Sequence, residues 1–306
     1  MRIMTLARPF VKWAGGKVNL LDLLESHLPV DFNKQTEITY IEPFVGGGSM
    51  LFHMLNTHSN ISYVIINDIN KDLIRCYQLI KENPDALIKE LSALEKKYNA
   101  CETEDSRKAY YYMVREMYNH GNLNEDAKAA HLIFLNKTCF NGLYRVNHNG
   151  EFNVPYGIYR KQIICNTDII QADHKLLQKV EIKCGSYEKL FPRLGEGYCF
   201  MYLDPPYRSI KGATNFRKYS EYKFEDEEQI NLKAFCDVYS NAGCHIMLSN
   251  SDSENEDGSS FFSELYNGYF CETIVAPRFI NSFSAKKKKQ TEVLIKNYNS
   301  LKGASV

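Results

Sequence analysis

The chain has 306 residues, of which 44% are hydrophobic and 24% charged, a composition that excludes a wholly disordered or fibrous protein. Its 37 basic residues balance 37 acidic ones, so the net charge indicates neither a nucleic-acid nor a membrane partner. Nine cysteines without a C-x-x-C pair predict reduced thiols rather than a zinc cluster or a disulfide framework, and no stretch approaches the ~18 apolar residues that span a bilayer, so we expect a cytoplasmic protein.

Short segments rich in β-branched and aromatic residues predict buried strands. Connections long enough for helices separate the first five, which favours an α/β fold with a doubly wound parallel sheet. The last two segments predict an antiparallel hairpin. In chain order, the predicted strands are 39–44, 62–68, 180–184, 198–204, 244–250, 269–277 and 292–298.

The stretch between the second and third predicted strands is too long for a single crossover. Helical spacing of apolar residues runs through 71–100 and again through 106–139. Further on, Asn149-Gly150 stands between alternating residues, which is the strongest short signal for a β-hairpin. The sequence therefore predicts an inserted, mostly helical domain over residues 71–175 that ends in a β-hairpin.

The first predicted strand runs into a glycine-rich loop, Glu42-Pro43-Phe44-Val45-Gly46-Gly47-Gly48-Ser49. Glycines after a buried strand permit a tight turn and let a ligand approach the bare backbone. Asp68 ends the second predicted strand, where a carboxylate meets the ribose hydroxyls of a nucleotide-like ligand. The two features together predict such a ligand, although a glycine turn and a helix-capping aspartate explain each feature alone.

The segment Asp204-Pro205-Pro206-Tyr207 ends the fourth predicted strand, at the edge where doubly wound sheets bind ligands. Two prolines stiffen the turn and remove two backbone donors, which leaves an acceptor-rich corner. Hydrogen bonds from an exocyclic amine to the Asp204 carboxylate and the Pro205 carbonyl would draw the amine's lone pair out of conjugation with a planar base. Tyr207 would stack on that base. The alternative is a strand-ending turn with a surface tyrosine.

Together these segments resemble the Dam family, the α-class DNA adenine-N6 methyltransferases that depend on S-adenosylmethionine. The resemblance runs from residue 10 to about residue 298, and the motifs follow in the family's order. The matching segments are 10–17 (FVKWAGGK), 42–49 (EPFVGGGS), 67–70 (NDIN), 135–147 (LNKTCFNGLYRVN), 150–157 (GEFNVPYG) and 204–207 (DPPY).

The resemblance implies a Rossmann-like methyltransferase sheet, with residues 1–70 and 176–306 as the catalytic domain and residues 71–175 as the target-recognition domain. It implies S-adenosylmethionine as the cofactor, S-adenosylhomocysteine as the product, and in-line transfer that needs no metal. The implied catalytic residues are Asp204, Pro205, Pro206 and Tyr207. The implied cofactor-binding residues are Trp13, Lys17, Phe44, Gly46, Gly48, Asp68 and Asp204.

The resemblance also implies double-stranded DNA as the substrate, with the target adenine flipped out of the helix because its amine is otherwise out of reach. The predicted hairpin would enter the major groove, where base edges are distinguishable and an arginine favours guanine. Relatives with this hairpin methylate GATC, and a cognate restriction endonuclease is a further partner that the family allows. The implied DNA-binding residues are Lys12, Phe140, Asn141, Leu143 and Arg145.

The neutral total charge hides basic segments over 208–223 and 276–302, which we expect to contact phosphates, and an acidic segment over 224–257. Two alternatives stay open. An RNA adenine or DNA cytosine-N4 methyltransferase would use a similar Pro-Pro-aromatic corner, but the GEFNVPYG-containing insert argues against it. A catalytically silent DNA-binding relative would have no need of the intact acceptor corner or of the glycine loop.

Overall fold

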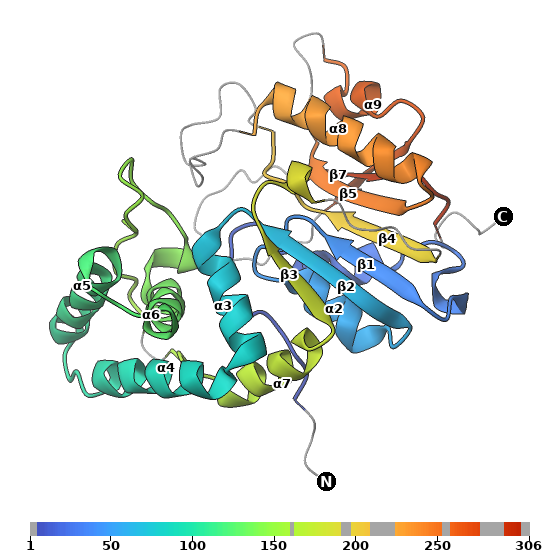
Figure 1. The fold of residues 1–306 in the computed structure, drawn as a ribbon. Coiled ribbons are helices and arrows are strands. Elements are labelled where there is room, and N and C mark those ends of the chain that lie inside the picture. Colours follow the sequence, from blue (N-terminus) through green and yellow to red (C-terminus); the bar gives the residue numbers. More distant parts are fainter. Residues whose placement is uncertain are drawn as a thin grey trace.

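The computed structural model of the chain describes residues 5–159, 162–190, 197–208, 224–252, 258–275 and 291–300. Within these ranges, seven strands form one sheet in the order β3-β2-β1-β4-β5-β7-β6 (Figure 1). The first five strands run parallel to one another, whereas β7 is antiparallel to both β5 and β6, so the doubly wound sheet and its C-terminal antiparallel pair are confirmed. The strands are β1 (Ile38–Glu42), β2 (Ile61–Asp68), β3 (Val180–Cys184), β4 (Tyr198–Leu203), β5 (His245–Ser251), β6 (Phe270–Val275) and β7 (Thr291–Lys296).

Helices cover both faces of the sheet (Figure 1). The α-helices are α1 (Leu21–Glu25), α2 (Ser49–Thr57), α3 (Lys71–Glu82), α4 (Pro84–Asn99), α5 (Glu104–His120), α6 (Glu125–Thr138), α7 (Thr167–Leu177), α8 (Asp226–Asn241) and α9 (Phe261–Leu265). Successive strand residues point to opposite faces. In β1, Tyr40 therefore joins the core under α2, α3 and α7, and Ile41 joins the core under α8 and α9.

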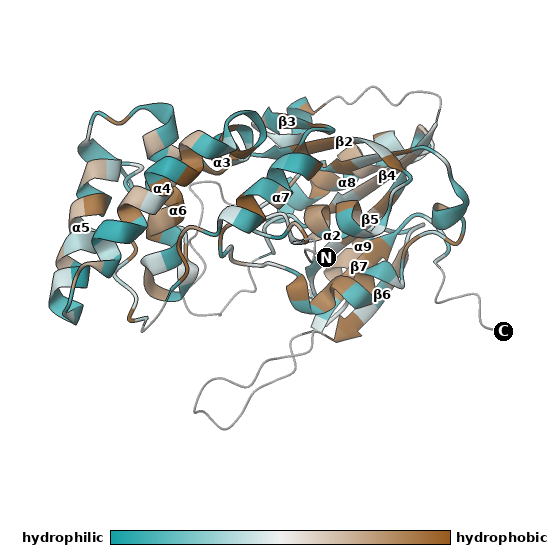
Figure 2. Cartoon of the chain, turned by 90° about the horizontal axis from the view of Figure 1, so that it is seen from below, coloured by the Kyte–Doolittle hydropathy of each residue, from teal (hydrophilic) through white to brown (hydrophobic). Residues whose placement is uncertain are grey.

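Hydrophobic residues are concentrated in the strands, as Figure 2 shows for β2 and β4, whereas α3 and α4 carry many hydrophilic residues. This distribution is that of a sheet buried between two helical layers. Among the described helices, none combines the length and the apolar character needed to cross a membrane.

The predicted insert consists mainly of α3 to α6, with α6 at its centre. The run 129–136 of α6 is buried throughout, and α6 contacts α3, α4 and α5. Side chains at the helix starts accept hydrogen bonds from backbone N–H groups of the first turn, which fixes where the helices begin. These capping residues are Asn70, Asn83, Thr103 and Asn124. Because α3 also contacts β2 and β3, the division of the chain at residue 71 stays a prediction.

The predicted hairpin after α6 is present as two arms joined by isolated bridges rather than as two regular strands. The bridges link Cys139 to Tyr156 and Val146 to Phe152. Phe140–Gly142 forms a 3₁₀ turn within one arm, and Pro155 in the other arm has no N–H to donate, so a continuous ladder cannot form. At the tip, the Asn147 side chain accepts hydrogen bonds from the backbone N–H groups of Asn149 and Glu151.

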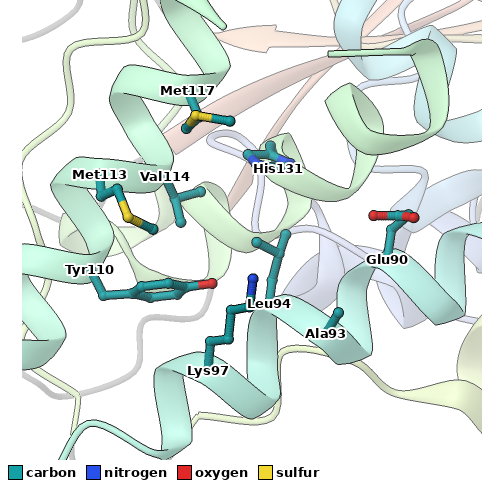
Figure 3. A pocket seen from close by; sticks show the side chains of 9 residues that line it. All are labelled: Glu90, Ala93, Leu94, Lys97, Tyr110, Met113, Val114, Met117 and His131. Atoms are coloured by element: carbon teal, nitrogen blue, oxygen red, sulfur yellow. The ribbon is translucent and has the colours of Figure 1, made fainter. Parts of the chain in front are cut away.

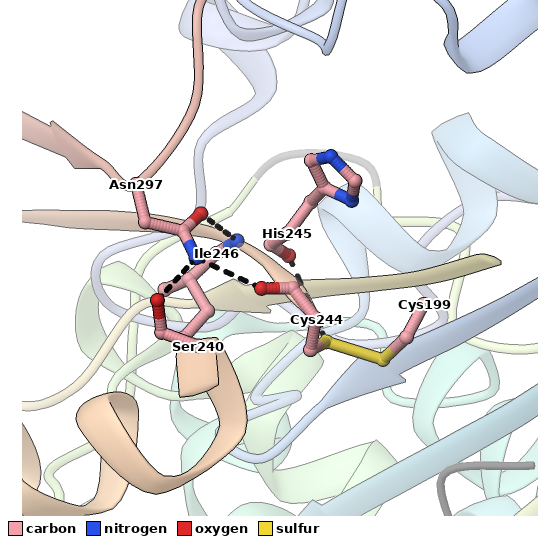
Figure 4. Close-up of a disulfide and its surroundings, with 6 residues drawn as sticks. All are labelled: Cys199, Ser240, Cys244, His245, Ile246 and Asn297. Atoms are coloured by element: carbon pink, nitrogen blue, oxygen red, sulfur yellow. Dashed lines mark hydrogen bonds between the residues drawn. A yellow bond between two sulfur atoms is a disulfide. The ribbon is translucent and has the colours of Figure 1, made fainter. Parts of the chain in front are cut away.

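The expectation of reduced thiols is wrong for two cysteines. Cys199 in β4 and Cys244, which directly precedes β5, form a disulfide with their Cα atoms 4.7 Å apart (Figure 4). The register that pairs Phe200 with His245 brings the two preceding residues side by side. Sequence spacing could not reveal this pair, because it depends on β4 and β5 being neighbours in the sheet.

Candidate active site

The predicted motifs meet at the carboxyl edge of the sheet. The chain runs from β1 outward to β2 and β3 and then returns to β4 on the other side of β1, so the topological switch lies between β1 and β4. Doubly wound sheets bind their ligands at such a switch. The glycine loop follows β1, Asp204 follows β4, and Asp68 ends β2, so three motifs that are distant in the sequence border one site.

The side chains of Asp68 and Tyr77 hold the glycine loop through hydrogen bonds to its backbone. Gly46 and Gly48 have φ angles of +48° and +78°, which other residues adopt only with strain. The Asp68 carboxylate accepts hydrogen bonds from the backbone N–H groups of Gly46, at 3.0 Å, and Asn70, at 2.9 Å. The Tyr77 hydroxyl donates to the Gly46 carbonyl at 2.9 Å. Burial raises the pKa of Asp68, and these backbone N–H groups oppose that rise.

Two aromatic residues lie at the loop: Trp13 packs on it, and Phe44 is part of it. A Cβ atom at Gly47 would lie 2.9 Å from the Trp13 Cβ atom, so the tryptophan packs directly on the loop backbone. The indole of Trp13 stacks on the Tyr144 ring of the insert, with centroids 5.3 Å apart. Phe44 is partly exposed and contacts the ring of Tyr187 at 5.2 Å. Trp13 therefore lies between the loop and the insert.

Lys17 is buried beside the Asp-Pro-Pro-Tyr corner. Its Nζ atom lies 2.8 Å from Asp204 Oδ1, and only 5% of its side chain is exposed, so it is not an ordinary surface lysine. The same ammonium donates to the Tyr207 hydroxyl and to the Gly15 carbonyl. Burial raises the pKa of Asp204, against the opposing charge of Lys17. In the turn itself, the Pro206 carbonyl accepts a hydrogen bond from Gln229, and Pro205 is buried.

The predicted DNA-binding residues gather in the arm that follows α6. Phe140 is 51% exposed, and Asn141 is exposed with a φ angle of +55°, a conformation that asparagine tolerates. Leu143 is half-buried. Arg145 is exposed, and its guanidinium donates to the side-chain and main-chain oxygens of Asn153. Lys12 packs beside this arm, with its ammonium 4.2 Å from the centre of the Tyr159 ring.

The family described as D12 class N6 adenine-specific DNA methyltransferase matches residues 13–278. The chain belongs to this family. The protein is therefore an adenine-specific DNA methyltransferase, and its resemblance to the Dam family is confirmed.

Relatives match this methyltransferase over nearly its whole length. The Type II methyltransferase M.MjaIII of Methanocaldococcus jannaschii is 42% identical over 294 residues, which cover 95% of this chain and 99% of the relative. The DNA adenine methylase of Vibrio cholerae is 33% identical and covers 95% and 96% of the two chains. That of Escherichia coli strain K12 is 31% identical and covers 94% of each.

The site of this methyltransferase also contains polar residues that the sequence did not single out. Glu292 at the start of β7 is 7% exposed, and its Oε2 atom lies 3.7 Å from Lys17 Nζ. Ser249 of β5 donates to Asp204 Oδ1 at 3.3 Å. Burial raises the pKa of Glu42 well above its ordinary range, although the Tyr40 hydroxyl donates to its carboxylate at 2.7 Å. No periodicity in the sequence identifies these residues. The one signal for Glu42 and Glu292 is a carboxylate within an otherwise mostly apolar strand.

A separate pocket lies inside the insert, between α4, α5 and α6 (Figure 3). Its lining is mostly apolar and includes Leu94, Val114 and the thioethers of Met113 and Met117. None of the residues predicted to bind cofactor or DNA lines it. The basic runs at 209–223 and 276–290 lie outside the described residues.

Proposed function

We propose that this methyltransferase transfers a methyl group from S-adenosylmethionine to N6 of an adenine that is flipped out of duplex DNA, at the sequence GATC. The observation that carries the proposal is the placement of Lys17, Asp204 and Tyr207 together at the switch between β1 and β4, beside the glycine loop. A cation, an acceptor and an aromatic ring are the groups needed to receive a zwitterionic cofactor and a planar base.

The residues at the glycine loop fit such a cofactor. A Cβ atom at Gly48 would lie 2.5 Å from the Tyr77 hydroxyl, so the loop accepts no side chain there and its backbone is bare. Lys17 would bind the carboxylate of the methionine moiety, and Asp68 would bind the ribose hydroxyls. Trp13 packs on the loop backbone, and Phe44 is part of the loop itself. The cofactor supplies an electrophilic methyl group on a sulfonium, so the tasks left to the chain are positioning and polarisation.

Asp204 and Pro205 would accept the two N6 hydrogens of the target adenine, which draws the nitrogen lone pair out of conjugation. Tyr207 would stack on the base and fix its plane. Flipping costs a few kcal/mol in lost stacking, and the contacts in this pocket offset that cost. The partly buried position of Asp204, whose side chain is 19% exposed, strengthens such hydrogen bonds, because water has limited access to its carboxylate.

The exposed arm carries the proposed sequence recognition. Among the described residues, Arg145 uses two N–H groups on Asn153, which leaves the others of its five donors for a guanine edge. The half-exposed Phe140 would fill the gap left by the flipped base. GATC is supported by the matches to relatives named DNA adenine methylase. The Type II methyltransferase among the relatives favours pairing with a cognate restriction endonuclease.

Tritiated methyl transfer to duplexes tests the proposal. We expect label on a duplex that contains GATC and none on the same duplex with its adenine replaced. Label on duplexes of another sequence would overturn the GATC assignment alone. If neither duplex is labelled, binding of S-adenosylhomocysteine by calorimetry decides whether the chain is a silent relative, and the Asp204→Asn variant serves as the inactive control.

A further inference from the structure

A buried amide, that of Asn136 on α6, joins the N-terminal segment that carries Lys12 and Trp13 to the insert. Asn136 Oδ1 accepts a hydrogen bond from the Lys12 N–H at 2.7 Å. Asn136 Nδ2 donates to the Lys12 carbonyl at 2.7 Å and to the Gly142 carbonyl at 2.9 Å. The Asn136 side chain is fully buried, so one carboxamide joins the backbones of two segments that are far apart in the sequence.

The contact between Lys12 and Gly142, which Asn136 bridges, is tightly packed. Gly142 has a φ angle of +62°, and a Cβ atom there would lie 2.5 Å from the Lys12 Cβ atom. The arm therefore lies directly against Lys12. If the carboxamide were removed, the Lys12 N–H and two carbonyls would lose their hydrogen-bond partners, which destabilises the contact because unpaired buried polar groups are costly.

Beyond Gly142 the arm is extended, with φ and ψ of −75° and 150° at Leu143. Alternate side chains of an extended segment point in opposite directions. Gly142 packs on Lys12 and Tyr144 stacks on Trp13, so this face of the arm is docked on the N-terminal segment. The predicted base-reading residues Leu143 and Arg145 alternate with these two.

Trp13 continues the connection to the cofactor side. Its indole Cδ1 atom would lie 3.1 Å from a Cβ atom at Gly46, and its Cβ atom 2.9 Å from one at Gly47. The glycine loop, Trp13, Lys12, Asn136 and the arm thus form one contiguous set of contacts. A displacement of the arm would therefore move groups that are packed against the glycine loop, and a displacement of the loop would move groups that are packed against the arm.

We propose that Asn136 is a positioning residue that couples recognition of DNA by the arm to binding of the cofactor at the glycine loop. The proposal rests on the proposed function, because it takes both sites from there. Such coupling is a free energy shared by two ligands, so each ligand raises the affinity for the other by the same factor, typically 5- to 150-fold.

The experiment measures this factor directly. Calorimetry gives the Kd of S-adenosylhomocysteine alone and in the presence of a saturating GATC duplex, and the ratio of the two values is the coupling factor. We expect a factor of at least about 5 for the wild type and a factor near 1 for Asn136→Ala. Tyr144→Ala should also lower the factor, whereas Tyr144→Phe keeps the ring and should retain it.

Asn297 provides a matched structural control. Its carboxamide likewise accepts from one backbone N–H, that of Ile246, and donates twice, to the Cys244 carbonyl and the Ser240 hydroxyl (Figure 4). It makes none of these bonds to the N-terminal segment or the arm. Asn297→Ala is therefore expected to lower the melting temperature and to leave the coupling factor unchanged.

The outcomes separate the two proposals. A coupling factor that survives in Asn136→Ala overturns the role of Asn136, as does a wild type that binds both ligands without coupling. If Asn136→Ala does not fold, the two Tyr144 variants decide. A wild type that binds no S-adenosylhomocysteine overturns the proposed function, and the coupling with it.

Discussion

The ammonium group of Lys17 lies 2.8 Å from the carboxylate of Asp204, and the side chains are only 5% and 19% exposed. A buried charge that loses its partner carries an uncompensated desolvation cost. Each charge therefore stabilises the other until ligand groups replace the contact. In the proposed reaction, a carboxylate would take the place opposite Lys17 and an amine the place opposite Asp204.

Replacement of Lys17 by methionine should weaken binding of S-adenosylhomocysteine at least tenfold, or about 1.4 kcal/mol, because the ligand carboxylate loses its cation. Lys17→Arg keeps the charge and serves as the control, with a smaller loss. Calorimetry on the purified variants measures both affinities. An unchanged Kd for Lys17→Met would show that the lysine serves Asp204 alone.

The rate of methyl transfer should depend on ionised Asp204. Burial raises the pKa of this carboxyl above its ordinary value of about 3.9, and Lys17 limits the rise. Activity is therefore expected to fall with decreasing pH through that raised pKa, and Lys17→Met should move the fall to higher pH. Asp204→Asn should lower kcat by about 10²- to 10⁴-fold and remove the acidic limb. A kcat–pH profile that is identical in the wild type and Lys17→Met would contradict this role.

Gly48→Ala should impair the glycine loop beyond the cost of its backbone conformation. Gly48 and Gly150 have nearly the same φ angles, +78° and +77°, but a Cβ atom meets the Tyr77 hydroxyl at 2.5 Å in the first case and nothing within 4 Å in the second. The shared strain costs about 1–2 kcal/mol in each variant. We expect Gly48→Ala to lose more stability than Gly150→Ala, and also cofactor affinity. Equal losses in urea unfolding, with equal Kd values, would show that the loop adapts.

Arg145→Ala should relax sequence discrimination rather than abolish catalysis. A bidentate contact to guanine contributes about 1–3 kcal/mol of discrimination, or roughly 5- to 150-fold in kcat/KM between cognate and substituted duplexes. Asn153→Ala removes one of the two hydrogen-bond acceptors of the same guanidinium, the side-chain oxygen, and should cause a smaller change in the same direction. Initial rates on duplexes substituted at each position of GATC measure the effect, and a uniform loss at all sequences would assign Arg145 to phosphate contact.

The strands were predictable from the sequence to within one or two residues, because buried strands carry runs of β-branched and aromatic residues that stand out from the surrounding polar sequence. The motifs at their ends were also predictable, since a parallel sheet brings carboxyl ends to one edge. The hairpin was predicted correctly as a chain reversal, but the loss of its ladder depends on the 3₁₀ turn at Phe140–Gly142.

Pairings between distant polar residues could not be predicted. The contacts of Lys17 with Glu292 and of Asn136 with Lys12 join segments whose proximity follows from the order of the strands and the docking of the insert. A lone lysine or asparagine is most often exposed, so the residue type alone predicts exposure, whereas both Lys17 and Asn136 are buried. The disulfide between Cys199 and Cys244 was missed for the same reason.

Asp173 predicts a pH dependence of stability that is separate from catalysis. Its fully buried carboxylate on α7 accepts the Arg8 N–H at 3.0 Å, and burial raises its pKa to about 8. The unfolded carboxyl titrates near 3.9. Between about pH 4 and pH 8 the folded chain therefore holds a proton that the unfolded chain has released. The contribution to stability is fully present below pH 4 and is lost as the pH rises, by at most about 1.4 kcal/mol per pH unit.

Asp173→Asn keeps an oxygen for the Arg8 N–H and cannot titrate. The free energy of unfolding is measured in urea from pH 5 to pH 9. The difference between the variant and the wild type should rise in favour of the variant up to about pH 8 and stay constant above it. Asp168→Asn, at an exposed position of the same helix, is the control for removing a carboxylate from α7. A parallel course of the wild type and Asp173→Asn across this range would mean that Asp173 is ionised in the folded chain, with Arg8 and Lys137 outweighing its burial.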